Sequence, residues 1–220
     1  MAVLDFTRQS TLIPPEISGL STTIVGVGSI GSHTAEILAK TGIGEMHVWD
    51  ADIVEPHNIA NQGYYLGDLG KKKVDALKER LEAGTGVSVV PHDCFYEGGP
   101  FGTELVISAL DSMKARKVVF TNFLEDPAAK IYIDGRMGSR FGKVFFVDKS
   151  DKDSIANYFA SLHSDAEAHT EPCTARSTIF CAYGISSLMC STLVSWIINE
   201  NYPHQVGADF RSCTVLPQAR

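Results

Sequence analysis

The sequence lacks the features that mark several classes of protein. No stretch of 18 consecutive apolar residues is present, so we expect neither a membrane span nor a membrane partner. The first ten residues lack the basic start and apolar core of a signal peptide, so we expect a cytoplasmic location. The 220 residues carry a net charge of −7. Basic residues form no stripe with interleaved aromatics, which argues against nucleic acid as a partner.

Cysteine is also scarce. The five cysteines are odd in number and have no regular spacing, so they do not predict a disulfide framework. Four of them, Cys94, Cys181, Cys190 and Cys213, are expected to pack as small apolar side chains. This pattern is typical of a chain that folds in a reducing compartment.

Segments with strand and helix patterns alternate along the chain. Strands are predicted at 22–28, 44–52, 86–94, 104–110, 130–137 and 143–149, and helices at 29–42, 71–83 and 113–125. A polar stretch without a clear period predicts a crossover loop at 150–172, before a long apolar helix at 177–200. We expect an α/β fold: one domain over 1–220 with a doubly wound, Rossmann-like, mostly parallel sheet and a final strand pair near 208–216.

The first predicted strand ends in the glycine pattern Gly26-x-Gly28-x-x-Gly31. Gly26 permits a tight turn, Gly28 lets the backbone approach a phosphate, and Gly31 lets the helix pack on the strand. The N-terminus of the following helix offers free N–H groups to an anion. The pattern predicts a nucleotide site without saying which nucleotide binds.

Polar residues follow the other strand ends. They are Asp50 and Asp52 after the second strand, Asn58, Asn61 and Gln62 in the next loop, Lys73 at a helix start, and Asp111 with Arg116 after the fourth strand. Carboxyl ends of parallel strands share one edge, where ligands bind. A carboxylate at that edge suits Mg²⁺, which an ATP-using enzyme needs and a dehydrogenase does not. Asp134 and Arg136 form a further polar strand end.

Five segments together resemble the ubiquitin-activating-type adenylyltransferases of the ThiF/MoeB/HesA superfamily. They are "TRQSTL", "VGVGSIGSHTAEILAKTGIGEMHVWDAD", "DIVEPHNIANQ", "LGKKKVDALKERL" and "ISALDSMKAR", in that order. The resemblance extends from Arg8 to about Leu188. It implies that the C-terminal glycine of a ubiquitin-like or sulfur-carrier protein is adenylated by ATP, with release of pyrophosphate.

The resemblance also implies roles for single residues. Asp50, paired with Asp52, would bind the ribose of ATP; Lys73 would contact the phosphates; and Asp111 would bind Mg²⁺. Asn58 would position the triphosphate and Gln62 the nucleotide loop. Arg8 would reach the active site of a partner subunit, so a homodimer is expected.

The sequence departs from the family pattern at two places. The family's usual arginine in "N-x-x-R-Q" is Asn61, so one phosphate-binding charge is missing, and Arg116, Lys71 or Lys72 are candidates to compensate. The chain also has none of the CxxC pairs that bind zinc in many members, so we expect no zinc. His163, His169 and Cys173 are too irregularly spaced to change that expectation.

Cys173 has two interpretations. In the family, a cysteine here accepts the activated protein as a thioester or takes part in sulfur transfer, and the adjacent Arg176 would favour the thiolate. Alternatively, Cys173 is a small apolar residue at a helix start.

Other functions stay open. Within the superfamily the chain could act on a small peptide, dehydrate a tRNA, or serve as a non-catalytic subunit. Outside it, the glycine pattern also fits an NAD-dependent oxidoreductase, in which Arg8, Lys73 and Asp111 would have no assigned role.

Overall fold

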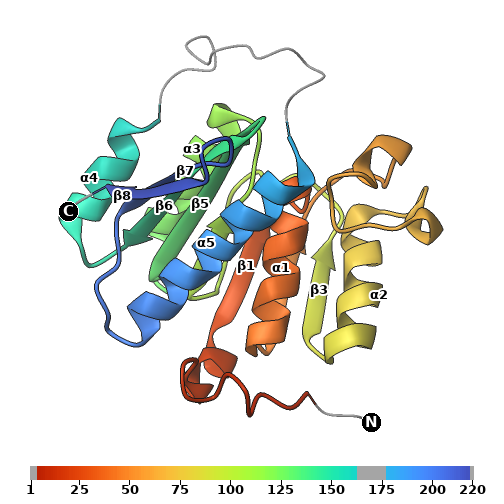
Figure 1. Cartoon of the computed structure of the whole chain (residues 1–220), viewed down its shortest axis with the longest axis horizontal. Helices are drawn as coiled ribbons and strands as arrows, with labels where there is room; N and C mark the ends of the chain where they lie inside the picture. Colours follow the sequence, from red (N-terminus) through yellow and green to blue (C-terminus); the bar gives the residue numbers. More distant parts are fainter. Residues whose placement is uncertain (1–3, 163–176, 219–220) are drawn as a thin grey trace.

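One sheet of eight strands organises the described residues, 4–162 and 177–218, of this computed structural model (Figure 1). The strand order is β3-β2-β1-β4-β5-β6-β7-β8. The parallel strands are β1 (Ser21–Val25), β2 (Glu45–Trp49), β3 (Ser88–His92), β4 (Leu105–Ser108) and β5 (Ile131–Gly138). The antiparallel extension consists of β6 (Phe141–Asp148), β7 (Gln205–Asp209) and β8 (Thr214–Gln218).

Helices cover both faces of the sheet. One core lies between the sheet and α1 (Ser29–Thr41), α2 (Lys73–Thr85) and α5 (Ile179–Ile197). A second core lies between the opposite face and α3 (Met113–Glu125) and α4 (Lys152–Ala160). Short 3-10 helices occur at Pro15–Gly19, Pro56–Asn58 and Leu66–Asp68. The predicted doubly wound, Rossmann-like fold in one domain is confirmed.

The chain direction across the sheet reverses between β1 and β4. β1, β2 and β3 run outward in one direction, and β4 then returns to the other side of β1. Loops that leave β1 and β4 therefore diverge at the carboxyl edge of the sheet, which opens a crevice there. This edge lies at the opposite end of the strands from the N-terminal segment (Figure 1).

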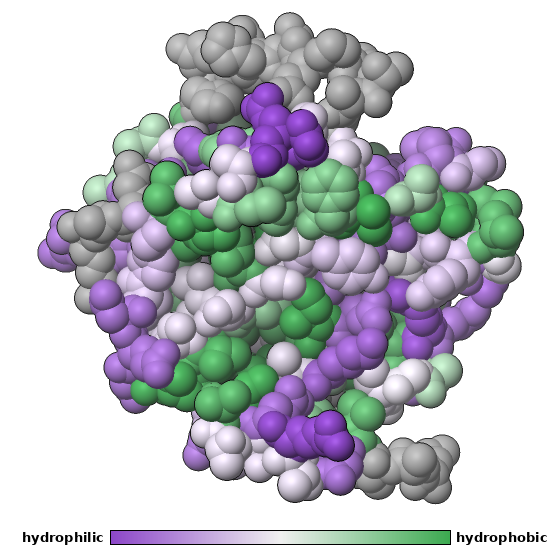
Figure 2. Space-filling view, in the orientation of Figure 1, coloured by the Kyte–Doolittle hydropathy of each residue, from purple (hydrophilic) through white to green (hydrophobic). Residues whose placement is uncertain are grey.

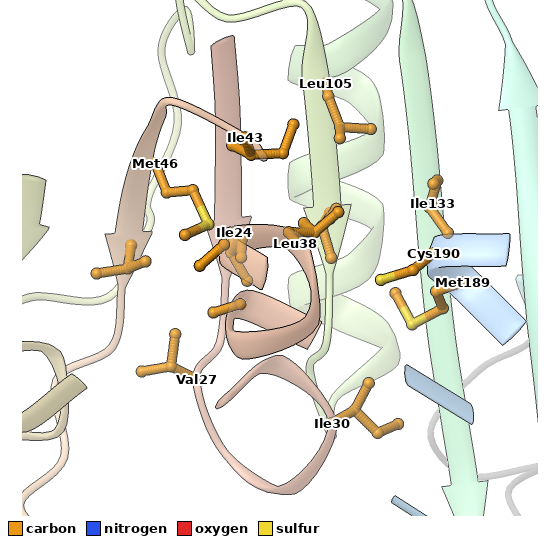
Figure 3. Packing of buried hydrophobic residues seen from close by; sticks show 14 of the residues in the cluster. Ile24, Val27, Ile30, Leu38, Ile43, Met46, Leu105, Ile133, Met189 and Cys190 are labelled. Atoms are coloured by element: carbon orange, nitrogen blue, oxygen red, sulfur yellow. The ribbon is translucent and has the colours of Figure 1, made fainter. Parts of the chain in front are cut away.

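Helix α5 bears on the expectation that the chain has no membrane span. Its 19 residues contain no charged side chain, and it is long and apolar enough to cross a membrane by length and composition alone. In the fold, however, Met189 and Cys190 enter the core beside Ile133 of β5 (Figure 3). The Ser186 hydroxyl donates a hydrogen bond to the Ile30 carbonyl at 2.9 Å. Here α5 is therefore a core helix. Its serines and threonines interrupt the apolar run but add no charge.

The predicted crossover loop at 150–172 is wrong in its first part, because residues 152–160 form α4. The Asp151 carboxylate caps this helix by accepting the N–H groups of Asp153 and Ser154. Only Ser154 and Tyr158 of α4 are buried, which is too few to give the sequence a helical apolar period. Residues 163–172 lie outside the described residues. The final strand pair is confirmed as β7 and β8.

Candidate nucleotide-binding cleft

The glycine turn joins β1 to α1 at the carboxyl edge. Gly26 has φ +87°, a conformation that favours glycine, and a Cβ on Gly31 would lie 1.9 Å from the Gly26 carbonyl oxygen. Gly28 is different, because a Cβ there would meet no atom within 4 Å. It precedes α1 without a side-chain cap, and together with Ser29 and Ile30 it lines a cleft of about 1270 Å³. The N–H groups of the first turn are thus available to an anion.

Asp50 connects the end of β2 to the glycine turn. One carboxylate oxygen accepts the Val27 N–H at 2.9 Å, and the other accepts the Asp52 N–H at 2.9 Å. Burial raises the pKa of Asp50, and Lys73 and the two N–H groups oppose this shift without cancelling it. Asp50 lines the cleft, so its remaining lone pairs are available to hydroxyl donors of a ligand.

Lys73 is positioned by two carboxylates. Its ammonium lies 2.7 Å from Asp52 and 4.0 Å from Asp50, and its side chain is only 6% exposed. The adjacent lysines lie apart from this pair: Lys71 contacts Glu79 and Asp68, and Lys72 contacts Asp93. A phosphate in the cleft would therefore have to compete with Asp52 for Lys73, whereas Lys71 and Lys72 already have carboxylate partners.

The loop after β2 places its three polar residues differently. Asn58 is buried and accepts the Glu55 N–H, which holds the loop in a turn. Asn61 donates its side-chain amide to the Ser177 hydroxyl. Gln62 lines the cleft, and its amide oxygen is buried without a hydrogen-bond partner among the described residues. At the place of the family arginine, the Asn61 side chain thus contacts the residue that leads into α5.

Asp111 is an exposed carboxylate in the cleft, at the start of the loop before α3. It has no hydrogen-bond or ion-pair partner within residues 4–162 and 177–218, and this range holds no cluster of three His, Cys, Asp or Glu suited to a metal. A single free carboxylate nevertheless fits Mg²⁺, which proteins often bind through one or two carboxylates with phosphate and water completing its shell.

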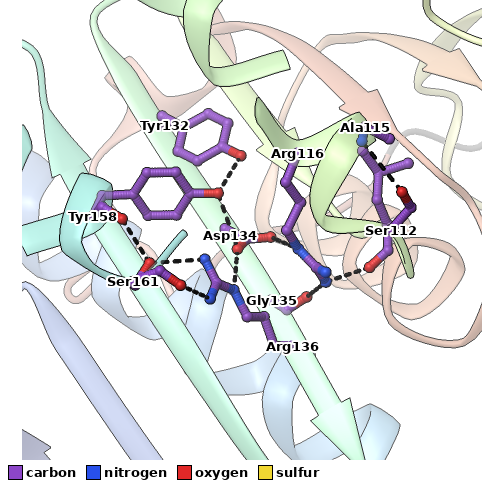
Figure 4. Close-up of polar contacts among 10 residues, drawn as sticks. Ser112, Ala115, Arg116, Tyr132, Asp134, Gly135, Arg136, Tyr158 and Ser161 are labelled. Carbon is purple, nitrogen blue, oxygen red and sulfur yellow. Dashed lines mark hydrogen bonds and ion pairs between the residues drawn. The ribbon is translucent and has the colours of Figure 1, made fainter. Parts of the chain in front are cut away.

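Arg116 points into a buried polar cluster (Figure 4). Its Nε donates to Asp134 at 3.0 Å, and a terminal nitrogen donates to the carbonyls of Leu110 and Gly135. It also lines the cleft. These contacts occupy much of the guanidinium, so Arg116 is poorly placed to replace the missing family arginine.

The remaining predicted residues lie away from the cleft or outside the described residues. Arg8 is exposed on the N-terminal segment, which Gln9 fastens to the end of α1 through the Lys40 carbonyl at 2.8 Å. This segment is at the far end of the strands from the cleft (Figure 1). Arg8 therefore cannot serve the cleft of its own subunit. Cys173, His163 and His169 lie outside the described residues.

The sequence analysis did not predict the aromatic wall that lies beside Asp50. The Trp49 ring stacks on His92 with centroids 4.0 Å apart, and Tyr96 meets the edge of Trp49 at 5.4 Å. Trp49 and Tyr96 line the cleft together with Cys94 and Phe95. The available signal was an aromatic residue directly before Asp50 and an aromatic pair, Phe95 and Tyr96, three and four residues after the end of β3. Cys94 and Cys213 are exposed, so the expectation that they pack as apolar residues is wrong, whereas Cys181 and Cys190 are buried.

The cleft has two sides, which we name by their elements. The glycine-turn side contains Gly28, Asp50, Lys73 and the aromatic wall. The β5–β6 side continues from Asp111 over β5 and β6, and is lined by Gly135, Arg136, Gly138, Phe141 and Lys143. The first side offers partners for anions and hydroxyl groups, and the second offers the side chains of Phe141, Arg136 and Lys143.

The fold and this cleft define a doubly wound α/β protein with a crevice at its switch point, where ligands of such folds bind. The model of the ThiF family matches residues 15–216. The chain therefore belongs to the ThiF family.

Several known proteins are similar to parts of the chain. It is 32% identical over 98 residues to the tRNA threonylcarbamoyladenosine dehydratase of Bacillus subtilis, covering 41% of this chain and 39% of that protein. It is 29% identical over 125 residues to ubiquitin-like modifier-activating enzyme 5 of Arabidopsis thaliana, covering 47% and 29%. The chain thus spans less than half the length of these relatives.

Among solved structures, Escherichia coli MccB with MccA-N7isoASN has a TM-score of 0.74, with 17% identity over 95% of this chain and 66% of that one. MccB has also been solved with ATP. At this identity the likeness establishes the fold alone.

Proposed function

We propose that this protein activates a carboxylate by adenylation with ATP. The observation that supports it is that the free α1 N-terminus, Asp50, Lys73 and Asp111 all border one cleft. These groups suit a nucleoside triphosphate with its magnesium. Asp50 can accept hydroxyl groups, the α1 N-terminus and Lys73 can bind phosphates, and Asp111 is a free carboxylate for the metal. An NAD site has no use for Lys73 or Asp111.

The nucleotide takes the glycine-turn side. Its ribose hydroxyls donate to Asp50, its base lies against Trp49 and Tyr96, and its phosphates face the α1 N-terminus. Lys73 exchanges Asp52 for a phosphate oxygen when ATP binds. Asp111 would hold Mg²⁺, which would supply positive charge to the phosphates.

The acceptor carboxylate enters along the β5–β6 side. A carboxylate oxygen attacks the α-phosphorus, the bond from that phosphorus to the bridging oxygen breaks, and pyrophosphate leaves with the electron pair. An acyl-adenylate remains. Negative charge grows on the leaving pyrophosphate. Lys73, together with a Mg²⁺ held by Asp111, would therefore lower the barrier.

For the acceptor we propose the C-terminal glycine of a ubiquitin-like or sulfur-carrier protein. The family and the similarity to ubiquitin-like modifier-activating enzyme 5 support this choice. An extended chain end would lie along the β5–β6 side of the cleft, beside Phe141, Arg136 and Lys143. A small peptide is the second candidate, supported by the fold shared with MccB.

We also propose a homodimer, because Arg8 can reach a cleft only in a second subunit. Exposed apolar side chains on α5 and on the loop beside α2 offer a contact surface, and Figure 2 shows apolar residues on this face. They are Ile179, Phe180, Tyr183, Tyr65 and Leu66. Light scattering that gives a monomer at micromolar concentration would remove the role of Arg8.

The first experiment compares thermal unfolding with Mg-ATP and with NAD, for the wild type and Asp111→Ala. A ligand at 100 times its dissociation constant stabilises the native state by about 2.7 kcal/mol. We expect stabilisation by Mg-ATP that weakens in the variant. Stabilisation by NAD alone would contradict the proposal. With a Gly-ended acceptor in hand, Cys173→Ala should keep adenylation and lose any covalent adduct.

A further inference from the structure

Asp134 is the centre of the buried polar cluster in Figure 4. It lies on β5, its side chain is 0% exposed, and it faces two arginines. Arg116 donates to one carboxylate oxygen at 3.0 Å, and Arg136 donates to the other at 2.6 Å. The Tyr158 hydroxyl adds a third bond at 3.1 Å. A carboxylate so enclosed cannot touch a ligand, so any role in the cleft must act through its partners.

One partner leads to Asp111. The terminal nitrogen of Arg116 donates to the carbonyl of Leu110, the residue immediately before Asp111. The same nitrogen reaches the Gly135 carbonyl at 3.4 Å. Arg116 therefore joins the loop between β4 and α3 to β5. Since the Asp111 side chain has no partner among the described residues, its position follows from this backbone anchor.

Asp134 sets the direction of the guanidinium that makes this anchor. Its bond to Nε fixes the plane of Arg116, and that plane aims the terminal nitrogen at Leu110. A planar fork with several donors can hold a carboxylate and a carbonyl together, whereas a lysine ammonium presents no such fixed geometry. The opposite carboxylate oxygen is occupied by Arg136, which is itself held by the Ser161 carbonyl and hydroxyl at 3.0 and 2.9 Å.

We propose that Asp134 and Arg116 are positioning residues that hold Asp111 where it binds the magnesium of Mg-ATP. This role rests on the proposed function. It gives the buried cluster a purpose beyond stability: without the anchor, Asp111 can move away from the metal, while the partners of the base and ribose stay in place.

The test uses the full chain and isothermal titration with AMPCPP at a series of Mg²⁺ concentrations, and with AMP in the absence of metal. The variants are Asp134→Asn, which keeps the shape and loses the charge, and Arg116→Lys, which keeps the charge and loses the fork. Asp148→Asn is the control, because it alters a partly buried carboxylate bonded to Trp196 near the other edge of the sheet.

We expect both variants to need about tenfold more Mg²⁺ for half-maximal AMPCPP binding, at the low end for residues that orient a metal ligand. Their AMP affinity should match the wild type, and Asp148→Asn should match it in both measurements. A parallel loss of AMP affinity, or an unchanged Mg²⁺ requirement, would overturn the role. If Asp134→Asn fails to fold, the Mg²⁺ requirement of Arg116→Lys tests the positioning role by itself.

The same experiment separates the two proposals. Wild-type protein that binds no AMPCPP at any Mg²⁺ concentration would overturn the proposed function, and the positioning role with it. Wild-type binding with unchanged Mg²⁺ dependence in Arg116→Lys would overturn the positioning role alone.

Discussion

The glycine-turn side and the β5–β6 side of the cleft are built by different means. On the first, the backbone fixes the geometry: Gly26 turns, Gly31 lets α1 approach, and Asp50 receives the Val27 N–H. On the second, side chains from separate elements fix it around Asp134.

This difference separates two kinds of vulnerability. A backbone-built site fails when a Cβ is added, because there is no space for the atom. A side-chain-built site fails when a charge is removed, because its buried partners lose their compensation. The variants that follow test that distinction, beginning with the largest expected effect.

Asp134→Ala should be the most damaging change on the β5–β6 side. It leaves Arg116, itself 6% exposed, and Arg136 without their shared carboxylate. Removing one partner of a buried ion pair costs about 3–5 kcal/mol. Urea unfolding measures the loss, with Asp209→Ala as the control, because the Asp209 side chain bonds to the nearby Arg211 and its loss should cost about 1 kcal/mol at most. Near wild-type stability for Asp134→Ala would mean that the two arginines find other partners.

Gly31→Ala should be the most damaging change on the glycine-turn side. The new Cβ would stand 1.9 Å from the Gly26 carbonyl oxygen, so β1 and α1 must separate. We expect a loss of about 3 kcal/mol, at the upper end for overpacking.

The matched control for that change is Gly28→Ala, which meets no atom within 4 Å. It should stay within about 1 kcal/mol of the wild type in stability. It should still weaken ATP binding, because the methyl occupies the approach of a phosphate. Equal stability losses at both glycines would contradict a backbone-built turn.

The same difference explains what the sequence could predict. Gly26, Gly28, Gly31 and Asp50 lie within one strand–helix–strand unit, so local pattern and spacing were enough to bring them together. The helix predicted at 29–42 is observed at Ser29–Thr41 for the same reason.

The β5–β6 side was harder to predict because its contacts are distant in the chain. Arg116 meets Asp134 across 18 residues, and Tyr158 reaches it from α4, which was expected to be a loop. Likewise, Lys72 seemed free to bind an anion, but Asp93, 21 residues later, lies beside it. Pairing between distant charges leaves no periodic signal in the sequence.

The pH dependence of ATP binding tests the glycine-turn side without altering its packing. Burial raises the pKa of Asp50 above 3.8, so it gains a proton as the pH falls through that raised value. The neutral acid is a weaker acceptor for ribose hydroxyls, and losing hydrogen bonds to a charged group costs about 1.5–3 kcal/mol. ATP affinity without metal should therefore fall as the pH drops through the raised pKa of Asp50.

The stability of the free protein should not fall with the ATP affinity as the pH is lowered. A carboxyl group whose pKa is raised in the folded state favours folding more as it becomes protonated, so Asp50 does not destabilise the free protein toward acid. Asp50→Asn should bind ATP weakly and should lack the part of the pH dependence that comes from Asp50. A wild-type affinity that stays constant to pH 4 would contradict the role of Asp50.

The smallest effect is expected at the start of α4, which carries Tyr158 and Ser161 to the β5–β6 side. Asp151 caps this helix and lies 2.9 Å from His204. Losing a capping side chain costs about 1 kcal/mol, so Asp151→Ala should lower the free energy of unfolding by that amount. Asp151→Asn can still cap the helix and should lose less.

The pH dependence of this cap has the opposite sign to that of Asp50. Burial alone would raise the pKa of Asp151, but the N–H groups of Ser154 and Asp153 and the neighbouring His204 lower it overall. The stabilisation is thus present above the unfolded pKa and is lost as the pH falls through the folded one. The difference between wild type and Asp151→Ala should shrink toward acid. Because the cap is distant from Arg116 and Leu110, neither variant should change the Mg²⁺ requirement for AMPCPP; a change would show that α4 and Asp111 are coupled through Asp134.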